Sequence, residues 1–255
     1  MSELPRLGVN IDHIATLRQL RGTPYPDMLE AARACEVAGA RQITVHLRED
    51  RRHIQDEDVK RLRAELEIPL NLEMAVADEI VRFAVRQKPD WACLVPEKRR
   101  EVTTEGGLDL GRNRRKIATT IQKLQKAGVR VSLFIEPSLD AIKLSHELGA
   151  DAVELHTGRY CLARQGAFGT RSANQASREL ERIRKTALLA KKLGMGAHAG
   201  HGFDYENVRS VAELKDPNKM PLIEEYNIGH AIVCRAALVG LERAVREMIS
   251  AISAP

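Results

Sequence analysis

The sequence predicts an α/β fold, a single (β/α)8 barrel with extra helices that spans residues 1–255. Three observations predict it: a strand-then-helix unit repeats eight times, no Pro/Gly/Ser-rich linker divides the chain, and polar side chains recur where the strands end. The length also allows two smaller domains. An open doubly wound sheet is the alternative architecture, but AGHGF at Ala199–Phe203 is too short and too late to be its G-x-G-x-x-G motif.

Period-two alternation of apolar residues locates the strands. In ITVHLR, Ile43–Arg48, apolar and polar residues alternate, so His46 and Arg48 share one face of a strand. The expected strands are Leu7–Ile11, Gln42–Leu47, Pro69–Glu73, Trp91–Val95, Arg130–Ile135, Ala152–His156, Gly196–Ala199 and Glu225–Ile228.

Start and stop signals bound the helices between these strands. Pro26-Asp27 opens one that ends at Gly39, and three acids at 56–58 occupy the first turn of another. Three more helices should end at glycines, which are Gly128, Gly149 and Gly194. Further helices are expected over Asp78–Gln87, Arg112–Ala127, Leu139–Leu148, Asn174–Leu193, Tyr205–Leu214 and Gly240–Ile252. Two long loops, Pro96–Gly111 and Tyr160–Ala173, are expected to act as lids or subunit contacts.

Composition is that of a globular protein, with 44% hydrophobic and 29% charged residues. No apolar run approaches the ~20 residues that span a bilayer, and no signal peptide is evident, so a cytoplasmic location and no membrane partner are expected. The net charge of +5 fits small anionic substrates better than nucleic acid, because acids alternate with the bases and aromatics are only 4%. The cysteines have neither disulfide nor zinc-site spacing; they are Cys35, Cys93, Cys161 and Cys234. Cys161 is a candidate thiol nucleophile.

The carboxyl ends of barrel strands form the active site of this fold, and here they are dense in ionisable groups. The candidates are Asn10, Asp12, His13, His46, Arg48, Glu73, Glu97, Lys98, Glu136, Glu154, His156, His201 and His230. His46, Glu73 and His201 are candidates for proton transfer, since imidazole titrates near neutrality and a carboxylate in a dry cavity is pushed toward it. Glu154 shares a face with His156 and should point into the barrel, where it orients an imidazole, stabilises positive charge or forms a structural ion pair.

Two sets of residues are suited to binding phosphate. The first set lies where barrels commonly hold a phosphate on backbone N–H groups and a helix N-terminus. Gly200 and Gly202 flank His201 after the seventh strand, and Gly229-His230 follows the eighth strand just before a helical run. Arg48 and His53, with Thr103 or Thr104, form the second set, and Arg18 and Arg21 are further candidate donors or solvated charges of a helix face. Two such sites imply two phosphorylated substrates.

Seven strings together resemble the pyridoxine 5'-phosphate synthase family over nearly the whole chain: GVNIDHIATLRQLRG, ITVHLREDRRHI, NLEMA, LVPEKRREVTTEGGLD, ELHTG, AGHG and NIGHAI. The resemblance implies a TIM barrel that forms homo-oligomers, typically octamers. It also implies condensation of 1-deoxy-D-xylulose 5-phosphate with 3-amino-2-oxopropyl phosphate to pyridoxine 5'-phosphate, phosphate and water. No metal or organic cofactor is implied.

Residue roles follow from the same resemblance. His46 and Glu73 would accept protons, His201 would donate one, and Glu154 would stabilise a transition state. The residues that would hold the deoxyxylulose phosphate are Asp12, His13, Arg48, His53 and Thr103. Those that would hold the aminoacetone phosphate are Asn10, Arg21, Gly202, Gly229 and His230.

One segment departs from the family pattern: Ala163–Asn174 looks longer and more basic than a minimal member needs.

Two other functions compete with the synthase. A barrel aldolase would use Lys98 as a Schiff base, or a metal on His46, His156 and His201. A basic RNA-binding protein would show salt-dependent affinity that survives the loss of His46 and Glu73.

Overall fold

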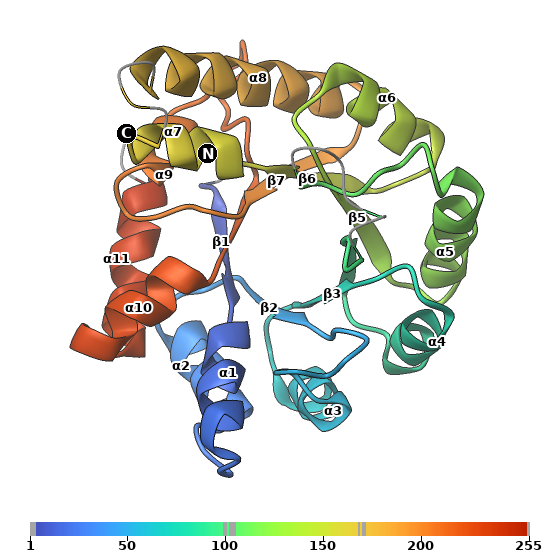
Figure 1. The fold of residues 1–255 in the computed structure, drawn as a ribbon, viewed down its shortest axis with the longest axis vertical. Helices are drawn as coiled ribbons and strands as arrows, with labels where there is room; N and C mark the ends of the chain where they lie inside the picture. Colours follow the sequence, from blue (N-terminus) through green and yellow to red (C-terminus); the bar gives the residue numbers. More distant parts are fainter. Residues whose placement is uncertain (1–3, 99–100, 102–105, 168, 170–171, 254–255) are drawn as a thin grey trace.

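The computed structural model describes residues 4–98, 101, 106–167, 169 and 172–253, and its centre is a closed barrel of eight parallel strands. Each strand pairs with its neighbours in sequence, and β8 closes the ring against β1 (Figure 1). The strands are β1 (Arg6–Asn10), β2 (Gln42–His46), β3 (Leu70–Met74), β4 (Trp91–Leu94), β5 (Arg130–Ile135), β6 (Ala152–His156), β7 (Gly196–Gly200) and β8 (Glu225–Ile228). The predicted (β/α)8 barrel is therefore confirmed.

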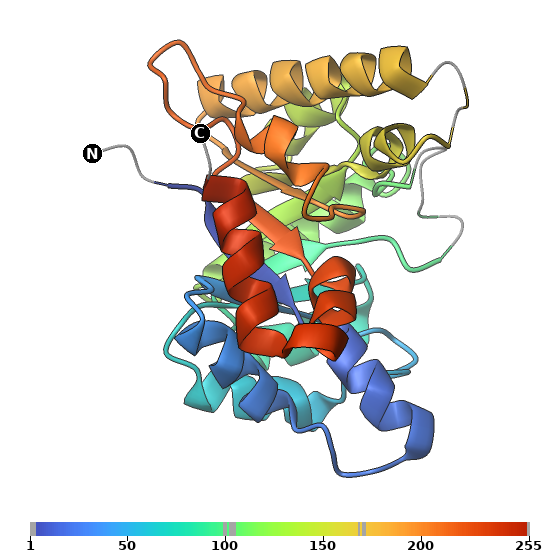
Figure 2. The same ribbon diagram turned by 90° about the vertical axis from the view of Figure 1, so that its left-hand side faces the viewer.

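Helices surround the barrel and cover the outer faces of the strands (Figure 1). They are α1 (Asp12–Arg21), α2 (Met28–Val37), α3 (Asp56–Glu65), α4 (Asp78–Gln87), α5 (Arg114–Lys126), α6 (Leu139–Glu147), α7 (Gly158–Arg164), α8 (Ser172–Lys192), α9 (Val208–Ala212), α10 (His230–Val239) and α11 (Leu241–Ser253). Seen from the side, α11 lies along the barrel wall and α10 packs at an angle to it (Figure 2). No helix among the described residues is long and apolar enough to cross a membrane.

Apolar side chains between the strands and the helices form the main core. On β2, Ile43 and Val45 point outward and are fully buried against this layer. On α8, Ile183 and Ala187 meet it from the helix side. Burial of this kind contributes about 25 cal/mol per Å2 of apolar surface, so this layer is the main source of stability.

The interior of the barrel is polar, unlike the layer outside it. Gln42 and Thr44 alternate with the apolar residues of β2 and point inward, where Gln42 Nε2 donates to Glu225 Oε1 at 2.6 Å. Thr44 Oγ1 donates to Asn227 Oδ1 at 3.0 Å, and Asn227 Nδ2 in turn donates to Glu154 Oε2 at 2.7 Å. Buried polar groups need such partners, and here the chain of hydrogen bonds leads from the barrel floor to the predicted site.

The structure corrects one expected loop and one expected helix, and it adds two helices, α1 and α7. The expected loop Tyr160–Ala173 is wrong, because α7 runs through Arg164 and α8 begins at Ser172. The expected helix Tyr205–Leu214 is shorter, since only Val208–Ala212 is helical. α1 follows β1 directly at Asp12, where polar site residues obscured the helical period. α10 begins at His230, where a helical run is expected.

Candidate active site

A cavity of about 1040 Å3 opens at the carboxyl ends of the strands. Side chains from β1, β2, β3 and β6 and from the turns after β7 and β8 line it. Its walls carry acids, imidazoles and backbone amides, so it is suited to proton transfer and anion binding.

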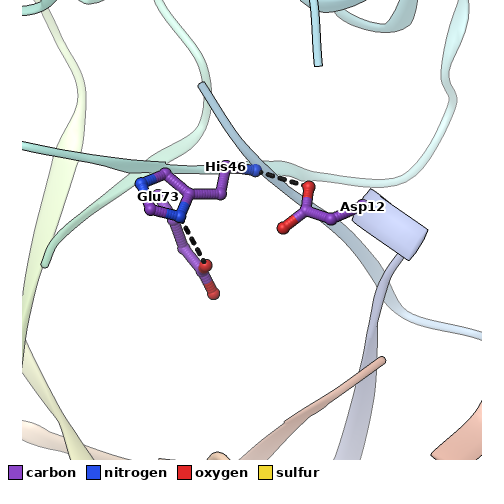
Figure 3. A group of neighbouring side chains, drawn as sticks. All are labelled: Asp12, His46 and Glu73. Atoms are coloured by element: carbon purple, nitrogen blue, oxygen red, sulfur yellow. Dashed lines mark hydrogen bonds and ion pairs between the residues drawn. The ribbon is translucent and has the colours of Figure 1, made fainter. Parts of the chain in front are cut away.

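His46, at the end of β2, is held by its backbone and by its ring. Its amide N–H donates to Asp12 Oδ1 at 2.8 Å, while its ring Nδ1 lies 4.0 Å from Glu73 Oε2 (Figure 3). Asn10 fixes Asp12 in turn: it accepts the Asp12 N–H at Oδ1 and donates from Nδ2 to Asp12 Oδ2, both at 2.9 Å. The register of β2 and β3, which pairs His46 with Glu73, brings the two catalytic candidates together.

Glu73 and Glu154 face the same cavity from β3 and β6. Burial, and then the nearby charges of Glu154 and Asp12, raise the pKa of Glu73 well above its usual value. Burial also raises the pKa of Glu154 to about 7, although the hydrogen bond from Asn227 opposes this. Glu154 can therefore exchange protons near neutrality, and Glu73 holds its proton more tightly than an ordinary carboxyl group.

Gly200 at the end of β7 makes room for Glu154. A Cβ on residue 200 would collide with Glu154 Oε1, so any larger residue would displace this carboxylate from the cavity floor. The close approach explains why glycine stands at a strand position where it otherwise weakens pairing.

Two imidazoles pack against each other on the β6–β7 side of the cavity. The rings of His156 and His201 have centroids 4.7 Å apart, and Phe134 contacts both by its ring. His156 Nδ1 lies 3.2 Å from Glu136 Oε1. Burial and the neighbouring His156 lower the pKa of His201, which favours its neutral form.

His201 stands in a left-handed turn, with φ of 74°, and Gly202 follows it with φ of 87°. A non-glycine residue in this conformation costs about 1 kcal/mol or more and is typical of functional sites. Thr157 supports the turn, because its Oγ1 lies within hydrogen-bonding distance of the carbonyl oxygens of Gly200 (2.8 Å) and His201 (2.7 Å).

The amino end of α10, whose N-cap residue is Gly229, lines the cavity beside β8, the strand next to β7. A Cβ on residue 229 would lie 2.7 Å from the Asn10 carbonyl oxygen, so this close approach requires glycine. The His13 and His230 rings meet edge to face with centroids 5.1 Å apart. Unpaired N–H groups at a helix amino end favour anions, and two imidazoles beside them add donors.

Comparisons with known proteins identify the family to which this site belongs. The sequence profile described as "Pyridoxal phosphate biosynthesis protein PdxJ" matches residues 7–254. The chain belongs to this family.

Curated relatives of this family match the chain over nearly its full length. The pyridoxine 5'-phosphate synthase of Geotalea uraniireducens is 53% identical over 246 residues, which cover 96% of this chain and 98% of the relative. The pyridoxine 5'-phosphate synthase of Trichlorobacter lovleyi is 50% identical over 252 residues, which cover 99% of this chain and 100% of the relative. Among solved structures, a phosphoribosylanthranilate isomerase of Thermotoga maritima has a TM-score of 0.58 at 12% identity, covering 98% of each chain, which shows the shared fold alone.

Most of the site residues that the family resemblance implied lie in one place. Those that line the cavity are Asn10, Asp12, His13, His46, Glu73, Glu154, His201, Gly202, Gly229 and His230. The structure thus brings together the four catalytic candidates, whose individual roles stay predictions.

Three other implied residues lie outside the cavity lining. Arg48 is oriented by Asp50, with Nε 3.3 Å from Oδ1. The centroid of the His53 ring lies 6.2 Å from that of the His46 ring. Arg21 is exposed in the last turn of α1, a helix of ten residues and so about 15 Å long that begins at the site with Asp12. Thr103, together with Thr104, lies outside the described residues.

Arg18 is a candidate that the structure contradicts as a free phosphate donor. Its guanidinium forms a two-pronged ion pair with Asp58, with both N–O distances 2.7 Å, and also donates to the His53 carbonyl at 3.1 Å. These contacts tie α1 to α3 and leave Arg18 a structural role.

Neither proposed nucleophile is activated. Burial raises the pKa of Cys161 to about 12, which keeps its thiol protonated. Lys98 lies outside the cavity lining with its side chain 47% exposed, and its Nζ pairs with Glu49 Oε1 at 2.8 Å. A Schiff-base lysine needs a buried setting that lowers its pKa, and Lys98 has none.

The residues placed to bind a metal are not the three histidines His46, His156 and His201 of the aldolase alternative. Within the described residues, one group has atoms that lie within 4.8 Å of one another: Asp12, His46 and Glu73 (Figure 3). The two Asp12 oxygens accept hydrogen bonds from His46 N and from Asn10 Nδ2.

Two functional neighbours escaped assignment from the sequence. Asn227 shares the inward face of β8 with Glu225, and this alternation was a readable signal. Glu97 was recognised only as a polar strand-end residue, but its Oε1 lies 3.0 Å from His46 Nε2. No local pattern shows that contact, because residues 51 positions apart make it.

Proposed function

We propose that this chain is a pyridoxine 5'-phosphate synthase that joins 1-deoxy-D-xylulose 5-phosphate to 3-amino-2-oxopropyl phosphate by general acid–base catalysis. The observation that carries the proposal is the convergence of His46, Glu73, Glu154 and His201 on one cavity of a chain that belongs to this family. Each comes from a different strand or strand end, so the barrel itself sets their geometry.

The reaction needs proton transfers rather than an enzyme nucleophile. One substrate carries an amine that condenses with the ketone of the other, and this step releases water without a lysine Schiff base. Ring closure and loss of phosphate then require several protons to be removed and returned. A cavity with two carboxyl groups of raised pKa and two neighbouring imidazoles supports this chemistry.

In the proposed mechanism, His46 and Glu73 take protons from the carbon atoms that form new bonds. Glu73 is suited to this because its raised pKa makes it a stronger base than an ordinary carboxylate once ionised. Glu154, on the cavity floor, faces the amine-derived nitrogen and stabilises the positive charge that develops there.

His201 is proposed to donate the proton that a leaving oxygen requires. Burial and His156 lower its pKa, and a bound phosphate dianion would favour the protonated ring. Gly202 and the α10 terminus at Gly229-His230 would supply N–H donors for the aminoacetone phosphate. Arg48, His53 and Thr103 are proposed to hold the other phosphate.

Two further expectations belong to this proposal: a cytoplasmic location and assembly into a homo-oligomer, with an octamer expected. Light scattering on the purified protein measures the assembly. A monomer would overturn the oligomer without bearing on the reaction.

The deciding experiment mixes both substrates with the purified protein and follows pyridoxine 5'-phosphate by absorbance. We expect turnover that His46→Ala and Glu73→Gln each reduce by about 100-fold or more while circular dichroism stays unchanged. Lys98→Ala, the matched control, keeps the activity because its side chain lies outside the cavity. Failure of the folded enzyme to form product would overturn the proposal.

The aldolase is tested in the same preparation. Borohydride with a ketose phosphate should leave no adduct on Lys98, and chelation should not change the rate. A trapped lysine adduct, or turnover that depends on a stoichiometric metal, would support the aldolase instead.

A further inference from the structure

The carboxylate of Glu97 joins the start of the β4–α5 connection to the catalytic candidate on β2. Its Oε1 lies 3.0 Å from His46 Nε2, and its Oε2 accepts the Glu49 backbone N–H at 3.0 Å. The Glu97 side chain is only 4% exposed. A buried carboxylate requires donors, and these two contacts supply one to each oxygen.

This geometry selects one protonation state of the His46 ring. An ionised carboxylate only accepts hydrogen bonds, so the proton of a neutral imidazole must reside on Nε2. Glu97 is ionised because hydrogen bonds from His46 and from the Glu49 amide outweigh the effect of burial and lower its pKa. Nδ1 is then left with its lone pair toward the cavity, 4.0 Å from Glu73 Oε2 and so outside hydrogen-bonding distance.

His46 is thus fixed at two points. Asp12 holds its backbone amide and Glu97 holds its ring, so rotation of the ring would cost the Glu97 contact. A carboxylate on the far nitrogen also stabilises the imidazolium that forms when Nδ1 takes a proton.

We propose that Glu97 is a positioning residue for the reaction: it holds His46 as the Nε2–H tautomer and directs Nδ1 toward the substrate as the base. This inference rests on the proposed role of His46 as a proton acceptor. It adds to that role a partner from the connection after β4, which acts through His46 and does not line the cavity.

Glu97→Gln tests the proposal in the full-length enzyme. The amide keeps the size of the side chain but loses its charge, and its NH2 group can donate to Nε2 and so favour the opposite tautomer. We expect kcat to fall about 10- to 100-fold with KM for both substrates changed less than about threefold. Glu97→Asp, which restores the charge on a shorter arm, should recover part of the loss.

Glu101→Gln is the matched control. Glu101 Oε2 accepts the backbone N–H groups of Glu97 and Lys98, at 3.2 and 3.1 Å, so this substitution perturbs the same chain segment without touching His46. Its kcat should stay within about twofold of the unsubstituted enzyme. An equal loss in both variants would show that Glu97 acts only through local structure, and would overturn the proposal.

A spectroscopic readout separates this proposal from the proposed function. Proton–nitrogen NMR of histidine-labelled enzyme, with the His46 signal assigned by its absence in His46→Ala, reports which ring nitrogen carries the proton. We expect the Nε2–H form in the unsubstituted enzyme and its loss in Glu97→Gln. The Nδ1–H form in the unsubstituted enzyme would overturn the positioning role even if product forms, whereas the expected tautomer without turnover would count against the synthase alone.

Discussion

Asn227 Nδ2 donates a hydrogen bond of 2.7 Å to Glu154 Oε2 at the floor of the cavity. Both residues are buried, and Asn227 Oδ1 accepts from Thr44, so the amide is fixed from both sides. The contact stabilises the ionised form of Glu154 and opposes the effect of burial on its pKa. Asn227 thereby links the polar barrel interior to the catalytic candidate Glu154.

Asn227→Ala should therefore destabilise the protein and raise the pKa of Glu154 further. The loss of a hydrogen bond to a buried charged group costs about 1–3 kcal/mol of unfolding free energy. The cost should be larger at pH 8, where Glu154 is mostly ionised, than at pH 5. Urea unfolding at both pH values measures it, and an equal cost at the two would contradict a role for this bond in holding the charge.

Glu154→Gln should change how stability depends on pH. The folded state raises this pKa from 4.5 to about 7, so protonated Glu154 stabilises the fold. This stabilisation is fully present below pH 4.5 and is lost as pH rises through about 7. The shift corresponds to roughly 3 kcal/mol of unfolding free energy. The variant, which has no proton to lose, should be the more stable protein at pH 8. The difference between the two urea unfolding curves, followed from pH 5 to 8, tests this; a constant difference would refute it.

Gly200→Ala should disturb the site without breaking the barrel. The new methyl group would collide with Glu154 Oε1, and overpacking of this kind costs about 1–3 kcal/mol. We expect at least a tenfold fall in kcat. Gly111→Ala is the control, because a Cβ there meets nothing closer than Asp109 Oδ1 at 3.6 Å and should leave kcat and Tm unchanged. Normal activity in Gly200→Ala would show that Glu154 has room to move.

The pH profile of the enzyme should be narrow for kcat/KM and broader for kcat. Glu73 acts only when ionised, above its raised pKa, while His201 donates only when protonated, below its lowered pKa. Bound phosphate raises the pKa of His201, so the alkaline limb of kcat should lie at higher pH than that of kcat/KM. Initial rates between about pH 5 and 9 measure both limbs, and superimposable limbs would argue against His201 as the donor.

Local patterns in the sequence predicted most of the fold correctly. Alternation along β2 and β6 located those strands, and helix starts such as Asp56 were readable from their charge. The same patterns failed at α1 and α7, because short helices that begin at a catalytic strand end carry functional residues where apolar ones would mark the period.

For the site, the sequence by itself determined which residues are candidates for the chemistry and, through the strand periodicity, that Glu154 and His46 point to the cavity side. Only the tertiary structure decided which of them meet. Closure of the barrel sets β8 between β7 and β1 and so brings Asn227 to Glu154, and it places Glu97 against His46. The tertiary structure also excluded two candidates. Arg18 is not a free phosphate donor, because it pairs with Asp58, and Lys98 is not placed as a nucleophile, because it lies outside the cavity lining. The physical reason is that hydrogen bonds and pKa shifts depend on distances of a few ångströms between residues far apart in the chain, and those distances exist only once the strands have closed into a ring.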